Sequence, residues 1–209
     1  MWLKKIQMVK DVQTLLGELL EDDLRIKILI PLLKAMGAHP VVDMHGRNEK
    51  GKDLYFSYKD LFKKARHCCV FIKAGDITKS GNNDIRSFKG AIEEALDIPL
   101  SSPIDFSLKV YIEEFYFICN GNINRDANDY LASEVFADKK FRNFRVFDLN
   151  KLSEVVRTLI HDFSPVIGKT YVFSCDNFEE FCQKIISHKD TNINGITLPI
   201  SSEVESGVI

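Results

Sequence analysis

Apolar residues recur every three to four positions between residues 8 and 36, which is the period of an amphipathic helix. Pro31 lies inside this stretch and Gly37 follows it, so we expect a helical region with a break near the proline. Three short strands are predicted next, over residues 40–44, 53–58 and 68–73. The third is almost continuously apolar, which is typical of a central strand buried on both faces.

Helices and strands then alternate as far as residue 161. Helices are predicted over residues 84–96, 126–136 and 150–161, and strands over residues 110–119 and 144–147. This order predicts an α/β fold with a mixed central sheet flanked by helices. Beyond Ser164 the pattern weakens to a short strand at 170–174 and a helix at 178–186. We therefore divide the chain into an N-terminal helical segment (1–21), a main domain (22–164) and a C-terminal appendage (165–209).

The charge of the chain is unevenly distributed. The formal net charge is -2, but residues 46–80 contain nine Lys and Arg residues against four acids, which is a local charge of +5. A basic segment in an acidic protein can hold a phosphate backbone, and scattered lysines on a solvated loop give the same count.

The five cysteines show no zinc-finger spacing, and three of them lie in apolar runs. Buried free thiols in a reducing compartment are the interpretation that we favour. The first residues are charged and amphipathic, which is unlike a signal peptide, and no apolar run has the length of a membrane span. The sequence thus predicts a cytoplasmic protein without a membrane partner.

Two residues with complementary chemistry stand at the ends of neighbouring predicted strands. Asp53 opens the second strand, and Lys73 closes the third, 20 positions later. If the two strands form a hairpin, both residues lie at the same edge of the sheet. A carboxylate can hold a Mg²⁺ ion that polarises a phosphate and acidifies a bound water, and a lysine can orient that water.

The segment Glu49-Lys50-Gly51-Lys52-Asp53, followed by an apolar strand that ends at Lys73, resembles the core of the PD-(D/E)xK (restriction-endonuclease-like) nucleases. The resemblance extends over about residues 22–162. Further segments that agree with it are 30–37, 92–96 and 115–121. It implies an αβββαβ core and hydrolysis of phosphodiester bonds in DNA, or alternatively in RNA, with Mg²⁺ or Mn²⁺. It also allows a role in restriction, phage defence or repair. Separately, the chain could form a homo-oligomer or belong to a larger parent protein.

One position departs from the family pattern. Two residues before the lysine the family has Glu or Gln, and this chain has Phe71, which cannot bind a metal ion. Strand alternation places Phe71 on the same face as Lys73 unless a bulge intervenes. Two explanations stay open: the missing ligand has moved to another carboxylate, or the domain has lost catalysis and kept the fold.

The resemblance assigns roles residue by residue. Asp53 would bind the metal ion and Lys73 would activate or orient the water. Candidates for the supplementary carboxylate are Glu49, Glu93 and Glu94. Three basic residues would contact phosphates: Arg47, Lys52 and Lys79. The alternative function is a catalytically inactive module of the same fold that binds nucleic acid or a protein partner.

Overall fold

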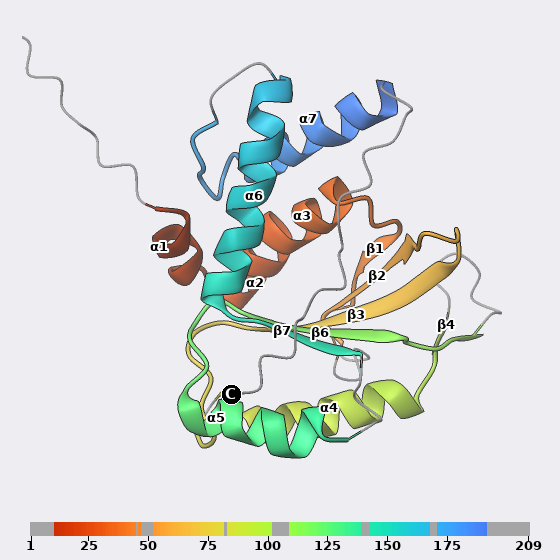
Figure 1. Cartoon of the computed structure of the whole chain (residues 1–209), viewed down its shortest axis with the longest axis vertical. Coiled ribbons are helices and arrows are strands. Elements are labelled where there is room, and N and C mark those ends of the chain that lie inside the picture. The colour runs from red at the N-terminus through yellow and green to blue at the C-terminus, as the bar shows by residue number, and fades with distance from the viewer. Residues whose placement is uncertain are drawn as a thin grey trace, which may run out of the picture.

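The computed structural model describes residues 11–44, 46, 52–81, 83–101, 109–138, 143–167 and 171–191. Its centre is a five-stranded mixed sheet in the order β1-β2-β3-β6-β7 (Figure 1). The first three strands are antiparallel neighbours: β1 (Val41–Asp43), β2 (Leu54–Lys59) and β3 (Ala65–Lys73). Two more strands continue the sheet parallel to β3: β6 (Glu114–Cys119) and β7 (Phe144–Phe147). The short strands β4 (Leu100–Ser101) and β5 (Lys109–Val110) pair with each other.

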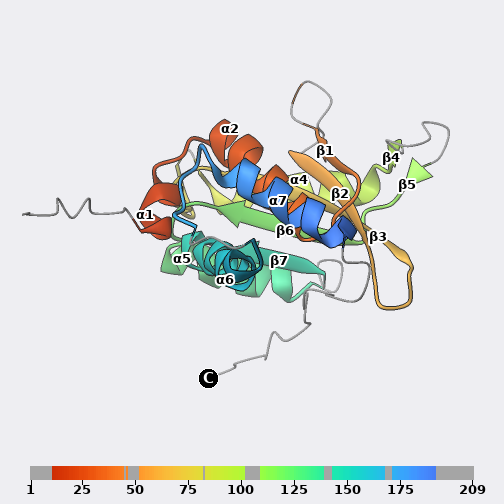
Figure 2. The same cartoon turned by 90° about the horizontal axis from the view of Figure 1, so that it is seen from above.

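Helices cover both faces of this sheet (Figures 1 and 2). One layer consists of α1 (Val12–Gly17), α2 (Glu21–Asp23), the π-helix η1 (Leu24–Leu29), α3 (Ile30–Ala35), α6 (Leu149–Ile167) and α7 (Phe178–Thr191). The other consists of α4 (Ile85–Asp97) and α5 (Arg125–Tyr130), which continues as the π-helix η2 (Leu131–Phe136). The predicted mixed α/β fold, with an αβββαβ order of elements and helices on both faces of the sheet, is confirmed.

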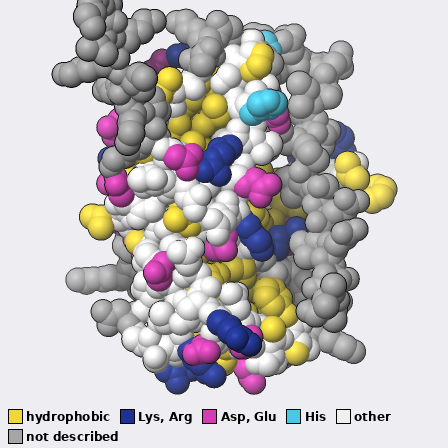
Figure 3. All heavy atoms as spheres, turned by 60° about the vertical axis from the view of Figure 1, so that its left-hand side comes forward, with side chains coloured by type: hydrophobic (Ala, Val, Ile, Leu, Met, Phe, Trp, Pro, Cys, Tyr) yellow, Lys and Arg dark blue, Asp and Glu magenta, His cyan; other side chains and the backbone are white. Residues whose placement is uncertain are grey.

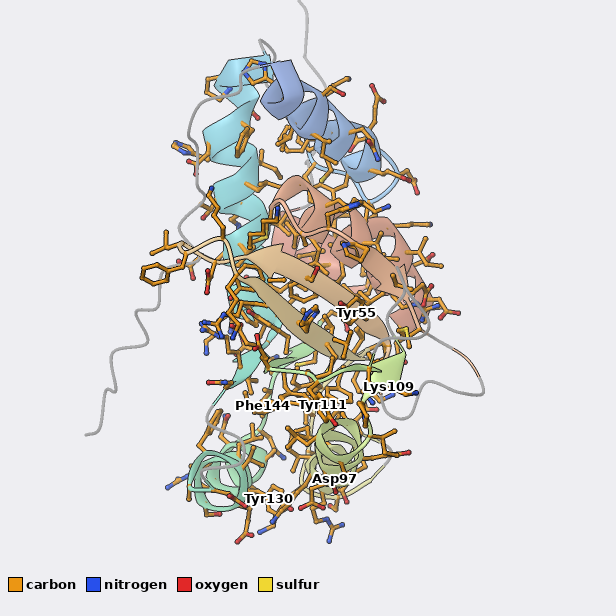
Figure 4. All side chains as sticks on the ribbon, turned by 90° about the vertical axis from the view of Figure 1, so that its right-hand side faces the viewer. Tyr55, Asp97, Lys109, Tyr111, Tyr130 and Phe144 are labelled. Atoms are coloured by element: carbon orange, nitrogen blue, oxygen red, sulfur yellow. The ribbon has the colours of Figure 1, made fainter. Side chains whose placement is uncertain are left out.

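Strand β3 is buried on both faces, as its apolar sequence predicts. Cys68, Val70 and Ile72 pack into the core below α3, α6 and α7. Cys69 and Phe71 point the other way, into the core above α4 and α5. In Figure 4, Phe144 of β7 lies in the same space between the sheet and α5, and its ring centroid is 5.9 Å from that of Phe136. The two apolar layers hold the ends of the strands in fixed positions.

The N-terminal helical region is interrupted at a different place from the one predicted. The first helix ends at Gly17, and helical structure resumes only at Glu21. Pro31 does not break the helix, because the π-turn η1 directly precedes it and it lies in the first turn of α3. A proline has no N–H to donate, and a locally wider helix accommodates the missing bond.

The boundaries predicted at residues 21 and 164 do not coincide with a gap in the packing. Leu16 of α1 and Ile185 of α7 belong to the same core cluster as Ile28. Residue 164 lies inside α6. The predicted helix at 178–186 is confirmed as part of α7, whereas residues 171–174 form no strand. Among the described helices, none combines the length and the apolar character that crossing a bilayer requires.

Candidate active site

The loops that leave β3 and β6 cross in close backbone contact on the side of the molecule shown at the left of Figure 1. A Cβ atom on Gly121 would lie only 2.1 Å from the carbonyl carbon of Gly75, so only glycine fits there. The Asp76 carboxylate accepts a hydrogen bond of 2.7 Å from the backbone N–H of Asn122. The carboxyl ends of the parallel strands therefore meet at a well-defined edge, where α/β proteins commonly bind ligands.

Asp53 places its carboxylate against the end of β3. Its backbone N–H donates to the carbonyl of Val70 at 3.0 Å, which continues the β2–β3 ladder by one residue. Its Oδ2 atom then accepts a hydrogen bond of 2.7 Å from the backbone N–H of Ile72. Because the carboxylate takes the place of a strand carbonyl, the half-buried Asp53 is fixed beside the last two residues of β3.

Lys73 is the last residue of β3, and its partner is a residue that the sequence pattern did not single out. The Nζ atom lies 3.3 Å and 3.4 Å from the two carboxylate oxygens of Glu21, at the start of α2. The Lys73 side chain is 39% exposed and that of Glu21 is 28% exposed. The contact is therefore an ion pair at the surface of the edge.

Asn120 explains how Glu21 reaches this position. It follows the end of β6, and only 1% of its surface is exposed. Its Nδ2 atom donates to the carbonyls of Leu16 and Leu19, both at 2.8 Å, and its Oδ1 atom accepts from the N–H of Gly75 at 2.8 Å. The side chain thus ties the α1–α2 connection to the loop that follows Lys73.

Sequence reasoning missed Glu21 because its pairing depends on this tertiary link. The usable signal was the acidic run Glu21-Asp22-Asp23, which opens a helix just before the segment that resembles the nuclease family. As a result, Asp53 and Glu21 contact consecutive residues at the end of one central strand. Asp53 bonds to the backbone of Ile72, and Glu21 pairs with the side chain of Lys73.

Four other predicted site residues lie away from the end of β3 or outside the described part of the chain. Glu49 and Arg47 are outside the described residues. Glu93 and Glu94 are exposed on α4, which begins at the carboxyl edge and leads away from it. Glu93 is eight residues into that helix, about 12 Å along its axis at about 1.5 Å per residue. The structure therefore does not bring Glu93 or Glu94 next to the end of β3.

The two described lysines with predicted phosphate contacts differ. Lys79 is exposed in the loop after β3 and remains available for such a contact. Lys52 has no exposed surface, so the prediction that it contacts phosphate at the surface is wrong. Its charge instead lies near the buried thiol of Cys69, where it acts to lower the thiol pKa, although burial has the larger effect and raises that pKa.

The basic segment 46–80 does not form one patch in its described part. Lys63, Lys64 and Arg66 lie at the turn of the β2–β3 hairpin, and Lys73 lies at the other end of β3, about 26 Å away at about 3.3 Å per residue. Arg66 forms ion pairs with Asp60 at 3.0 Å and Glu113 at 3.5 Å. In Figure 3, basic and acidic side chains are interspersed on the described surface at the carboxyl edge.

The cysteine and metal chemistry of the described residues is limited. Cys68 and Cys69 are fully buried, and burial raises the pKa of both thiols, so they remain protonated at neutral pH. They pack in the core, as predicted. No group of three or more His, Cys, Asp or Glu residues in the described part of the chain is arranged to hold a metal ion.

The carboxylate oxygens at the end of β3 are of the type that Mg²⁺ prefers as ligands. Mg²⁺ prefers oxygen ligands and is usually bound by only one or two protein carboxylates with several waters. Asp53 and Glu21 are two such carboxylates, and both reach the edge of the sheet from different elements.

Comparison with known proteins adds little to this geometry. No protein-family model matches the chain, and no curated protein matches it. Among solved structures, the chain is similar to the MspJI restriction endonuclease in complex with a 27-mer oligonucleotide, with a TM-score of 0.38 and 12% sequence identity. The match covers 84% of this chain and 34% of that one, so this chain spans about a third of the length of that protein. At this TM-score the likeness carries no functional argument, and the functional interpretation depends on the site itself.

Proposed function

We propose that this chain is a metal-dependent nuclease domain that hydrolyses phosphodiester bonds in DNA, with Glu21 as the relocated second carboxylate. The observation that carries the proposal is that Asp53 and Glu21 contact consecutive residues at the end of β3, Ile72 and Lys73. Phosphodiester hydrolysis needs groups of this kind, placed on rigid strand ends. DNA as the substrate class depends on the resemblance of the hairpin sequence to the nuclease family.

Four residues would each have a distinct task in catalysis. Asp53 and Glu21 would hold a Mg²⁺ or Mn²⁺ ion, which when bound polarises a phosphate and lowers the pKa of a coordinated water. Lys73 would orient the attacking water or stabilise the negative charge that develops on the phosphate. Lys79, exposed in the adjacent loop, would contact the phosphate backbone.

A second candidate is a nuclease-fold module that binds nucleic acid without cleaving it. It is favoured by the position of Phe71, which is 3% exposed and packed in the core where the family has a metal ligand. In that case the ion pair between Lys73 and Glu21 links α2 to the sheet and has only a structural role.

Cleavage of plasmid and linear DNA with Mg²⁺ and with Mn²⁺ separates the two candidates. We expect Asp53→Asn, Glu21→Gln and Lys73→Ala each to lower the cleavage rate by roughly 100-fold or more. Asparagine keeps the acceptor oxygen for the Ile72 N–H, so loss of activity in Asp53→Asn would not result from loss of that bond. Lys59→Ala, an exposed lysine at the far end of β2, is the matched control and should cleave normally.

Three further variants locate the second carboxylate. If Glu21 has this role, Glu49→Gln, Glu93→Gln and Glu94→Gln retain activity. Loss of activity in one of these and not in Glu21→Gln would move the ligand to that residue. Wild-type protein that binds DNA with a strong salt dependence but never cleaves it would establish the binding module. Cleavage that survives both Asp53→Asn and Lys73→Ala would refute the catalytic assignment.

A further inference from the structure

A cavity of about 250 Å³ lies between the sheet and the helices α3 and α6, on the face opposite α4 and α5. Most of its lining is apolar and comes from both helices and from β2, β6 and β7. The lining includes Leu33 of α3, Tyr58 of β2, Tyr116 of β6, Arg145 of β7 and Val155 of α6. Several of them are half-buried, so the cavity is accessible from the surface.

Arg145 carries the single charge in this lining. Its side chain is half-buried on β7, and its guanidinium forms no hydrogen bond or ion pair within the described part of the chain. A guanidinium presents several N–H donors in a rigid plane, and it is rarely left without an acceptor when partly removed from water. In the part of the chain that the structure describes, the Arg145 guanidinium thus has no protein acceptor, and a ligand carboxylate can provide one.

The nearby acid is already engaged. Both carboxylate oxygens of Glu114 accept hydrogen bonds from tyrosines of the lining, from the Tyr58 hydroxyl at 2.7 Å and from the Tyr116 hydroxyl at 2.8 Å. The two hydroxyl protons are thereby directed to Glu114. The strongest group that remains for an incoming molecule is the guanidinium of Arg145.

We propose that this cavity binds a small amphiphilic carboxylate, whose apolar body fills the space between α3 and α6 and whose carboxylate pairs with Arg145. A cavity of about 150 Å³ is enough to hold benzene, so this one has room for a body of roughly ten non-hydrogen atoms. An apolar pocket with one well-placed polar group is the usual form of a small-molecule site. The proposal is independent of the nuclease proposal, because it uses none of the residues at the end of β3.

Titration calorimetry with three eight-carbon probes tests the charge requirement. Octanoate is expected to bind to the full chain more tightly than octanol or octylamine. Arg145→Gln should weaken octanoate binding at least tenfold and leave octanol binding unchanged. Arg157→Gln, which removes an arginine on α6 that pairs with Asp11 at 2.8 Å, should leave both unchanged.

A cavity-filling variant tests the location. Val155→Phe places a ring in the cavity from α6 and should abolish octanoate binding, and a thermal unfolding transition would show that the variant is folded. If Val155→Phe does not fold, Leu33→Phe places a ring in the same cavity from α3. The proposal is overturned if octanoate does not bind, if octanol or octylamine binds as tightly, or if Arg145→Gln has no effect. A concentration-dependent dimer that Val155→Phe dissociates would also overturn it, because the cavity would then be a contact surface between copies.

Discussion

The two ends of the β2–β3 hairpin contain the same kinds of charged residue and use them differently. At the turn, the Asp60 carboxylate accepts hydrogen bonds from the N–H groups of Phe62 and Lys64, at 2.9 Å and 3.0 Å, and from the Arg66 guanidinium at 3.0 Å. At the opposite end, Asp53 and Lys73 bond to groups 19 and 52 positions away in the sequence.

The difference lies in how far each end depends on the rest of the fold. The three donors to the Asp60 carboxylate lie within six positions of it, and the turn backbone includes Lys63 in the left-handed region at a φ of 63°. The carboxyl edge needs the α1–α2 connection and the loops after β3 and β6 to be in place together. A substitution at the edge should therefore reduce stability much more than one at the turn.

The largest effect is expected from restoring the family carboxylate. Phe71→Glu puts a carboxyl group into a closed apolar cluster and removes a packed ring, so the free energy of unfolding should fall by about 4 kcal/mol or more. Phe62→Glu at the turn, where the ring is 90% exposed, should change it by less than about 0.5 kcal/mol. Urea unfolding monitored by circular dichroism measures the free energy of unfolding of both variants. A stable Phe71→Glu protein that gains metal-dependent cleavage would contradict the closed packing around Phe71.

Asn120→Ala should have the next largest effect. The substitution leaves two backbone carbonyls and one N–H without their partner in a buried place, so the expected destabilisation is about 2–4 kcal/mol. Asn150→Ala is the matched control, because that side chain makes an exposed bond of 2.8 Å to Gln13, and its loss should be nearly neutral. Equal urea midpoints for the two variants would show that Asn120 does not hold the edge together.

The thiol of Cys119, which is paired with Lys73 in the register of β3 and β6, should make the free energy of unfolding depend on pH above 9. Burial raises the pKa of Cys119, which pairs with Lys73 across β3 and β6, to about 12 from a usual value of 9.0. The unfolded chain loses this proton first, so stability should fall as the pH rises from 9 to 12, by about 1.4 kcal/mol per pH unit. The difference in unfolding free energy between wild type and Cys119→Ser, measured across this range, isolates the contribution. A difference that does not change with pH would exclude a buried thiol.

The smallest effect is expected at the turn. Partial burial alone would raise the pKa of Asp60, but hydrogen bonds from Lys64, Phe62 and Arg66 outweigh it and hold that pKa below its usual range. Stability from this carboxylate is therefore present above the unfolded pKa of about 4 and is lost as the pH falls through the lower folded value. Asp60→Asn should lower the thermal midpoint slightly at pH 7 and hardly at all at pH 2. A larger drop at pH 2 than at pH 7 would reverse the assigned sign.

The contrast between the two ends also explains which features the sequence could predict. Strand β3 and the αβββαβ order follow from local alternation and periodicity. The direction of Phe71 could not be predicted, because a bulge would reverse it, and the continuous register of residues 68–73 with β6 excludes that bulge. The burial of Lys52 could not be predicted from local pattern, because a lysine beside a turn is usually exposed to solvent. Glu21 could not be found, because only the folded chain brings Asn120 to the carbonyls of Leu16 and Leu19.

The composition of the chain gave the number of basic residues in segment 46–80 but not their positions in the fold. The local charge of +5 in residues 46–80 is real, yet a long hairpin divides its lysines and arginines between two ends of the sheet. Counting along the chain treats Lys63 and Lys73 as neighbours, whereas an extended strand separates them. The nuclease interpretation therefore depends on the few groups at the end of β3 and not on a broad basic surface.

The packing of α7 on α3 has a consequence for the protein during its synthesis. Leu32 of α3 and Phe178, Phe181 and Ile185 of α7 belong to one apolar cluster, but the ribosome makes α3 long before it makes its cover. At the usual speed of translation, the apolar face of α3 waits on the order of ten seconds for α7. The nascent chain is therefore expected to be a client of ribosome-associated chaperones until α7 emerges.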